Sequence, residues 1–563
     1  MMREARRSYD AYRRAAGPVE NTLIDEFAAG EMDRSEFLRR GTTFGLSLSA
    51  VGAILTALGE APIAFGSPQA ARSGGRIRVA IIPPPTGQLE PHLLADQGGA
   101  AVTSIVGEFL NRANPNLTLA PELATSWKPN ADASSWTFKL RQGVRFQNGQ
   151  LMRADDVVAT FRRLADPGTG SQAVSAFGGI LSPDGVRKVD DLTVAFDLET
   201  PTASFPYLPS SPTYQAIVLP AGYQLGTFAG NPQATGAFRL VSYTPGVGAS
   251  FDRFGGWWRG QALLDGVDVS FYSDPSATVA AVLGDAADLV NQVQFATARP
   301  LFSNSAVQIF SVHGGLHRQM PMRVDLPDPL HDRRVRQAIA FTLDRQQIVK
   351  TLFNGLATPG NDHPFASVYP SSVPVSQRQR DIRKARQLMA AAGHEKGFSI
   401  TLTAPQVQEI PQFAQIVQES VRAIGIKMKL DLRTLASYFA GSQTGHPSGW
   451  GSTPWLNTPL NITPWGYRPV PNLFLTAALG AKGVWNAAHY SNKEFDRIAK
   501  SYIASVSIKD QRKYAKQLET ILQEDTPVIF PYFYDAITAG SPRVKGYHVD
   551  AFGPMYLGRT SLA

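Results

Sequence analysis

The sequence contains no cysteine. This absence excludes disulfide bonds and thiolate metal sites, and it also excludes the acylated cysteine that would tether an exported protein to a membrane. Internal repeats of fixed period are missing as well. Charged residues make up 18% of the 563 residues and hydrophobic residues 43%, a balance typical of a folded soluble protein rather than a disordered one. A chain of this length is too long for a single hydrophobic core, so we expect two or more packed lobes.

The usual sequence signatures of enzymes are also lacking. We find no Gly-x-Ser-x-Gly elbow, no His-Glu-x-x-His zinc helix and no phosphate-binding Gly-Lys-Ser/Thr loop. His313 and His317 are four residues apart, but Gly314 and Gly315 between them disfavour a helix that could carry two metal ligands. We therefore expect neither catalysis nor a metal or other cofactor, and keep an exported hydrolase as an alternative.

The formal net charge is +8, but several arginines lie within the first forty residues. Basic character of this kind is a poor indicator of nucleic-acid binding, because a leader that is removed would take much of the charge with it. We expect no nucleic-acid partner.

Residues 1–66 are typical of an N-terminal leader with an export signal. Residues 41–58 form an apolar stretch rich in small and hydroxyl side chains, which follows Arg39 and Arg40 and is short for a membrane span. Ala64-Phe65-Gly66 offers small residues for cleavage before Ser67. The preceding run DRSEFLRR resembles a twin-arginine signal, although Ser35 stands where the second arginine belongs. General secretion and an uncleaved membrane anchor remain open, and we expect a soluble periplasmic protein.

Beyond the leader, a linker over residues 67–75 precedes a strand over residues 76–82, which three prolines end. Residues 136–140 alternate between apolar and polar side chains and predict a half-buried strand, followed by a turn at residues 147–149. Asp155 and Asp156 then open a helix that extends to Leu164.

The second half alternates between helices and strands. We expect a helix from residue 332, a second helix capped by Asp344 and ended by Asn354-Gly355, and a helix over residues 382–392 that stops at Gly393. Strands over residues 398–402 and 427–432 flank another helix at residues 413–424. This alternation predicts an α/β lobe.

Long stretches of the chain resemble the family 5 extracellular solute-binding proteins, the peptide, oligopeptide and nickel binders of bacterial ABC importers. The similar segments are PELATSW and WTFKLRQGVRFQNGQLMRADDVVATFRRL within residues 121–164, TGAF at 235–238, VRQAIAFTLDRQQIV within 332–355, KARQLMAAAGHEKG at 384–397 and WNAAHYSNKEFD at 485–496. The resemblance covers essentially the whole chain after the leader.

The resemblance implies a two-lobed α/β protein with a ligand cleft between the lobes. Lobe 1 would comprise residues 76–313 and a return at residues 530–563, and lobe 2 would comprise residues 314–529. The hinge would form where the chain crosses near residues 313–320 and 530–534. The resemblance also implies a monomer that captures a small peptide or peptide-like solute by hinge closure and delivers it to the permease subunits of an ABC importer.

The richest candidate for ligand contact is the aromatic, proline-rich run over residues 448–474. Rigid aromatic faces with a few polar groups are typical of small-molecule pockets, although the same run could be a packed surface loop. The candidate ligand-binding residues here and nearby are Trp450, Trp455, Trp465, Tyr467, Arg468, Trp485 and Asn486.

Arg468 is the most informative of these candidates. In peptide-binding relatives this part of lobe 2 resembles Trp-x-x-Asp, whose carboxylate holds the ligand's ammonium, whereas here Trp465 is followed at that spacing by Arg468. A guanidinium favours carboxylate, phosphate or carbonyl acceptors instead. An anionic non-peptide solute and a saccharide therefore remain alternatives to a peptide.

Overall fold

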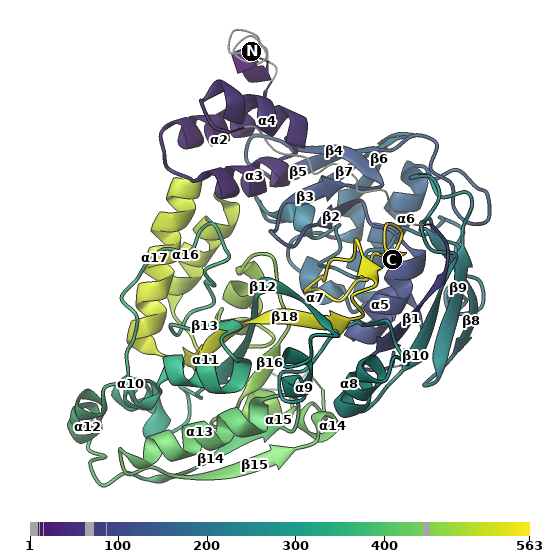
Figure 1. Ribbon diagram of the computed structural model, residues 1–563. Coiled ribbons are helices and arrows are strands. Elements are labelled where there is room, and N and C mark those ends of the chain that lie inside the picture. Colours follow the sequence, from purple (N-terminus) through teal and green to yellow (C-terminus); the bar gives the residue numbers. More distant parts are fainter. Residues whose placement is uncertain (1–8, 11, 15, 62–72, 86, 443–450) are drawn as a thin grey trace.

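The computed structural model describes residues 9–10, 12–14, 16–61, 73–85, 87–442 and 451–563 (Figure 1). Its largest sheet has ten strands, eight of which follow the order β16-β12-β18-β11-β1-β10-β9-β8, while β13 and β17 pair with β18 and β12. The strands are β1 (Arg76–Ile81), β8 (Phe238–Thr244), β9 (Gly248–Arg253), β10 (Gly266–Phe271), β11 (Leu289–Val290), β12 (Gln308–Pro321), β13 (Ala357–Pro359), β16 (Thr463–Trp465), β17 (Val528–Ile529) and β18 (Tyr532–Gly540).

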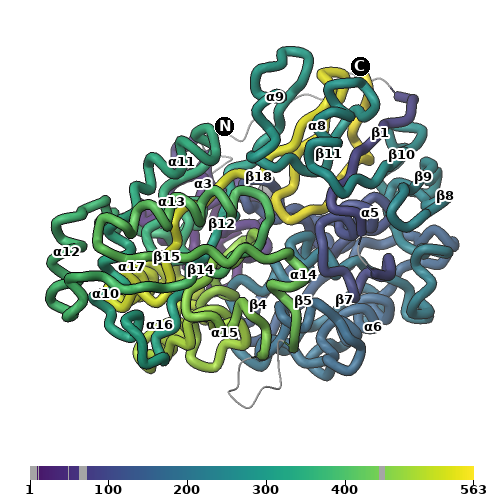
Figure 2. The backbone as a smooth tube through the Cα atoms, turned by 90° about the horizontal axis from the view of Figure 1, so that it is seen from below, coloured from purple at the N-terminus to yellow at the C-terminus, as the bar shows by residue number. Residues whose placement is uncertain are grey.

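Strands β12 and β18 join the two halves of the molecule. They pair antiparallel from Gln308 opposite Gly540 to His317 opposite Phe533, and the register shifts between Val312 and Leu316. In Figure 1 they run between the half that contains β1 and β8–β10 and the half that contains the helices from α10 (Arg333–Thr342) to α17 (Ile508–Asp525), and Figure 2 shows the same separation from below. The two segments in which the sequence predicts crossings, residues 313–320 and 530–534, are therefore hydrogen-bonded neighbours.

The first half contains a second, antiparallel sheet in the order β4-β5-β7-β6, packed against α6. Trp136 and Phe138 of β5 are fully buried, as the alternating pattern predicts. Helix α6 begins with the expected acidic turn, in which the Asp156 carboxylate accepts a hydrogen bond of 2.7 Å from the Arg153 amide. The elements of this half not yet named are α5 (Gln97–Val106), β2 (Asn111–Ala113), β3 (Leu119–Pro121), β4 (Ala124–Pro129), β5 (Ser135–Leu140), α6 (Ala154–Ala165), α7 (Val174–Phe177), β6 (Val186–Asp190), β7 (Thr193–Asp197), α8 (Pro275–Leu283) and α9 (Arg299–Phe302), and the return carries β19 (Val544–Lys545) and β20 (Ser561–Leu562).

In the second half, the parallel pair β14 and β15 packs against α13 at the edge of the molecule, and the helix boundaries predicted from capping residues are confirmed. The Asp344 side chain accepts a hydrogen bond from the Gln347 amide at the start of α11, and Asn354 ends that helix in a left-handed conformation. The elements are α10 (Arg333–Thr342), α11 (Arg345–Phe353), α12 (Ile382–Ala391), β14 (Ser399–Pro405), α13 (Ile410–Arg422), β15 (Lys427–Arg433), α14 (Leu435–Tyr438), α15 (Pro454–Asn457), α16 (Lys493–Ala504) and α17 (Ile508–Asp525).

The N-terminal segment folds into α2 (Pro18–Ala28), α3 (Arg34–Thr43) and α4 (Leu48–Ala57), which lie beside α17 and the β3–β5 region (Figure 1). The apolar stretch expected over residues 41–58 is divided between two helices, because Gly45 turns the chain with a φ of 88°. In the described residues no helix is long and apolar enough to cross a membrane. The expected cleavage position at residues 64–67 lies outside the described residues.

Candidate ligand-binding cleft

A cavity of about 390 Å³ opens where the two halves of the molecule meet. Its wall combines three parts of the chain that are distant in sequence: residues 83–97 and 291–295 of the first half, residues from Leu316 to Gly466 of the second half, and residues 534–553 of the C-terminal return. Strands β12 and β18 pass along it, since Leu316, Arg318 and Tyr534–Ile537 contribute to the lining. The volume suits a small solute of a few residues.

One charged pair in the cavity wall is internally satisfied. Arg318 is 1% exposed, and its guanidinium lies 2.8 Å from the Glu409 carboxylate. The Tyr532 hydroxyl donates a second bond of 2.8 Å to Glu409, and the Arg318 guanidinium lies 4.8 Å from the Tyr534 ring centre. Because the charges of Arg318 and Glu409 cancel within the wall, this pair gives rigidity rather than a free charge for a ligand.

Two further carboxylates line the cavity without an arginine or lysine bridge of their own in the described residues. Asp535 is 8% exposed and lies 2.7 Å from Nδ1 of His313, and this hydrogen bond raises the pKa of His313. Asp550 accepts a hydrogen bond of 2.7 Å from the Phe552 amide, while its burial raises the pKa of the carboxyl to about 7. With the Arg318 charge cancelled, Asp550 adds negative charge to the cavity wall as the pH rises through about 7, and Asp535 adds a second carboxylate, whose partner is His313.

Trp465 contributes to the second-half wall of the cavity and is backed by an aromatic cluster. The residue is 8% exposed, and the indole N–H of Trp465 has no hydrogen-bond partner in the described part of the chain. Its ring packs edge-on against Trp455, Phe474 and Trp485, with centroid distances of 6.2, 5.5 and 5.6 Å. A buried donor beside the cavity is suited to a ligand acceptor, because a tryptophan N–H normally finds a partner when it is buried.

Comparison with known proteins identifies this architecture. The family model for bacterial extracellular solute-binding proteins, family 5 (middle region), matches residues 118–479. The chain belongs to this family. The predictions of family, two-lobed α/β fold and solute-binding role are therefore confirmed.

Relatives of this family 5 protein differ in the solutes that they are named for. The glutathione-binding protein GsiB of Pectobacterium atrosepticum is 26% identical, with 82% of this chain and 89% of that protein covered. The heme-binding protein A of Haemophilus influenzae is also 26% identical, with coverages of 77% and 82%. Among solved structures, the periplasmic binding protein DppA of Helicobacter pylori, in complex with the peptide STSA, has a TM-score of 0.72 at 20% identity and covers 87% of this chain and 98% of its own. AgaA of A. tumefaciens, in complex with agropinic acid, has a TM-score of 0.69 at 23% identity, with coverages of 87% and 99%.

The family 5 protein brings several of the sequence-predicted site residues together. Trp455, Trp465 and Trp485 share one aromatic cluster, and Trp465 lies in the cavity wall. Asn486 is fully buried and donates to the carbonyls of Gly480 and Tyr490 at 3.0 and 2.7 Å, which holds a turn. Trp450 lies outside the described residues.

Tyr467 and Arg468 follow Gly466, which lines the cavity, but neither is part of the lining of the described cavity. Tyr467 stacks on Phe552 with ring centres 4.7 Å apart. The Arg468 guanidinium donates to the Tyr467 carbonyl at 2.8 Å, and the Tyr369 hydroxyl donates to the Arg468 carbonyl at 2.7 Å. Contact between Arg468 and a ligand stays a prediction.

Sequence reasoning missed the cavity-lining carboxylates. Asp535 interrupts an otherwise apolar strand, YFYDAITAG, and a charged residue inside such a strand is a signal that could have been used. Asp550 lies in an irregular segment and carries no comparable signal.

Proposed function

We propose that this protein is the periplasmic substrate-binding component of an ABC importer, that it captures a peptide or peptide-like solute, and that it passes the solute unchanged to the permease. The observation that carries the proposal is the cavity whose wall is shared by both halves of the molecule and by the strands that join them. A solute held there stabilises the closed arrangement to the extent that it contacts both walls. The relatives named for glutathione binding support a peptide-like ligand.

We assign residues 76–313 and 530–563 to lobe 1 and residues 314–529 to lobe 2, with β12 and β18 as the hinge. Support comes from the antiparallel pairing of these strands and from their position between the two halves in Figures 1 and 2. The protein works as a monomer, since one chain supplies every part of the wall.

The carboxylates of Asp535 and Asp550 receive the positively charged group of the ligand. In this chain Arg468 stands at the position of the ammonium-binding carboxylate, so the positive end needs a partner elsewhere, and the cavity wall offers these two side chains. A carbonyl or carboxylate of the same ligand is suited to the Trp465 indole N–H and to Arg468. This distribution of charge favours a zwitterionic solute.

Export places the protein in the periplasm, where its relatives' class of protein works, and processing before Ser67 removes the leader. The support for this step is the sequence pattern of residues 33–66. The twin-arginine signal can be placed either on Arg34, where Ser35 replaces the second arginine, or, shifted, on Arg39-Arg40, which lacks the Phe-Leu that should follow; dependence of export on these arginines distinguishes the twin-arginine route from general secretion.

The test is calorimetry with two matched probes, Ala-Ala-Ala and N-acetyl-Ala-Ala-Ala, which differ in the charged amine. We expect the free peptide to bind one to one and the acetylated peptide to bind at least about tenfold more weakly, because a buried carboxylate would lose its partner. Asp535→Asn should remove most of this difference, whereas the exposed control Asp184→Asn should retain it. Equal binding of both probes by the wild type would contradict the assignment, and hydrolysis of either probe would contradict a pure binding role.

A further inference from the structure

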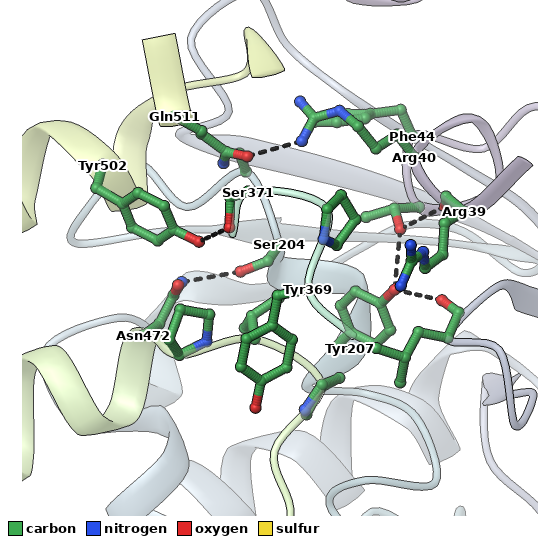
Figure 3. A pocket seen from close by; sticks show the side chains of 17 residues that line it. Arg39, Arg40, Phe44, Ser204, Tyr207, Tyr369, Ser371, Asn472, Tyr502 and Gln511 are labelled. Carbon is green, nitrogen blue, oxygen red and sulfur yellow. Dashed lines mark hydrogen bonds between the residues drawn. The ribbon is translucent and has the colours of Figure 1, made fainter. Parts of the chain in front are cut away.

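Helix α3 of the N-terminal segment is fastened to lobe 2 through its two adjacent arginines. The Arg40 guanidinium donates to Gln511 Oε1 at 2.7 Å and to the Val506 carbonyl. The Arg39 guanidinium donates to the Val368 carbonyl. Figure 3 shows both arginines at a pocket whose opposite wall includes Ser371, Tyr502 and Gln511 of lobe 2.

The same short stretch is fastened to lobe 1. The Leu119 amide donates to Thr42 Oγ1 at 3.0 Å, and the Trp127 indole N–H donates to the Thr43 carbonyl at 2.8 Å. Phe44 is 2% exposed and stacks on Trp136 with ring centres 5.9 Å apart. Residues 39–44 thus contact both lobes within two helical turns.

The two lobes also touch directly beside α3. The Asn472 side-chain amide donates to Ser204 Oγ at 2.9 Å, and the Ala203 amide donates to the Ile503 carbonyl at 3.3 Å. Figure 3 shows Ser204 and Asn472 in the wall of the same pocket as Arg39 and Arg40. The N-terminal segment therefore covers the line along which the closed lobes meet.

The fit of the segment is close. Gly45 packs so tightly that a Cβ added there would lie 1.8 Å from the Trp127 carbonyl oxygen. On the lobe 2 side, Arg512 forms an ion pair with Glu36, and the Ser507 hydroxyl donates to the Glu26 carboxylate. A segment with this many specific contacts fits one relative position of the lobes and would lose part of them if the lobes moved apart.

We propose that residues 16–61 act as a clasp that holds the two lobes closed, and that cutting the chain between this segment and β1 releases the clasp. While the segment is attached, docking is intramolecular and works at a high effective concentration. After a cut, the same contacts must hold a separate peptide that can diffuse away. The unprocessed chain is then a form that exchanges solute slowly, and processing produces the form that opens. This inference rests on the lobe assignment above and goes beyond solute binding.

Hydrogen exchange of the full chain without added ligand tests the clasp, so its outcome is separate from the outcome of the peptide titrations. Two variants undock the segment by different means: the double variant Arg39→Met, Arg40→Met removes the bonds to lobe 2, and Gly45→Val creates the collision with Trp127. Thr22→Val is the matched control, because the Thr22 hydroxyl donates to the Pro18 carbonyl within the same segment. The amides of β5, in the lobe 1 core, report whether the fold is intact.

We expect both variants to lose protection in α3 and, with it, at the Ala203 amide between the lobes, where exchange should accelerate about tenfold or more. The control should match the wild type at both places. Loss of protection in α3 with unchanged exchange at Ala203 would overturn the clasp. If α3 stays fully protected in the double variant, Arg39 and Arg40 do not hold the segment in place, and the clasp is contradicted. If β5 also loses protection in both variants, the segment belongs to the lobe 1 core rather than acting as a clasp.

Discussion

Glu519 of α17 is an acid whose surroundings oppose its charge. It is fully buried, the nearest His363 nitrogen lies 3.9 Å away, and burial raises the pKa of the Glu519 carboxyl to about 8. The folded protein therefore holds a proton between about pH 4.5 and pH 8 that the unfolded chain has released, so the contribution of Glu519 to stability falls as the pH rises through this window.

Glu519→Gln keeps the shape of the protonated side chain and removes the titration. We expect the variant to unfold at nearly the wild-type temperature at pH 5 and at a higher temperature at pH 8, with a difference in unfolding free energy of a few kcal/mol at most. Burial lowers the pKa of His363 to about 4, so its own effect lies between about pH 4 and 6.5 and is common to both proteins. Thermal melts of both proteins at both pH values measure the difference. An equal difference in melting temperature at pH 5 and pH 8 would contradict the raised pKa of Glu519.

The carboxyl of Asp550 should make ligand capture dependent on pH. Because the pKa of Asp550 is raised to about 7, the group gains its negative charge as the pH rises through neutrality. We expect affinity for Ala-Ala-Ala to increase about threefold to tenfold between pH 5.5 and 7.5. The release of a proton from His313, whose pKa is raised by Asp535, also increases affinity as the pH rises. Arg112, which lies nearby, lowers the pKa of Asp550. Calorimetry of Asp550→Asn over the same range should show a smaller increase, and an identical pH profile would exclude Asp550 as a contact.

At the residue scale the sequence pointed to one residue of the cavity wall, Trp465, and to none of its carboxylates. The Trp465 cluster follows from an aromatic run that is local in sequence. The carboxylates of Asp535 and Asp550 reach the cavity only through the pairing of β18 with β12 and the course of the return, which are long-range features. Arg468, predicted from motif spacing, lies beside the wall, and its guanidinium bonds the chain's own carbonyl.

At the element scale, local physical chemistry was sufficient for most helices and strands. Capping by Asp344 and the stop at Gly393 lie where the sequence predicts them, since both depend on a few adjacent residues. The N-terminal segment is the exception. Its contacts with the two lobes join residues that are hundreds of positions apart, so they could not be predicted from local sequence, and the export-signal interpretation of the same residues stays a prediction.

Two glycines at the edge of α12 allow a paired test of backbone fit. Gly393 and Gly397 both have positive φ, at 79° and 71°, but a Cβ at Gly393 would meet open space, whereas one at Gly397 would lie 1.9 Å from the Gly425 carbonyl oxygen. We expect Gly393→Ala to cost about 1 kcal/mol of stability from conformation alone, and Gly397→Ala to cost clearly more. Denaturant unfolding measures the loss of unfolding free energy for each variant. Equal losses would show that the loop at Gly425 moves away to make room for the added Cβ.

At the scale of the whole molecule, the two proposed lobes, joined by the proposed hinge of paired strands, should move as rigid bodies. Bound solute should raise the melting temperature by linkage, and in the Gly45→Val chain, whose clasp is undocked, it should also reduce the radius of gyration. Scattering of that variant with and without a saturating peptide measures the change. An unchanged radius with a demonstrated tight ligand would contradict closure around the cavity.

The cleft, as we propose, captures one zwitterionic solute through its acidic wall and leaves it unchanged. Native mass spectrometry of the purified full chain, followed by identification of the released molecule, tests this central claim most directly. We predict one small molecule per chain, chemically intact and carrying a positively charged group, with much lower occupancy in Asp535→Asn than in Asp184→Asn. A chain that carries no solute, or a solute that Asp535→Asn retains as fully as the control, would contradict the claim.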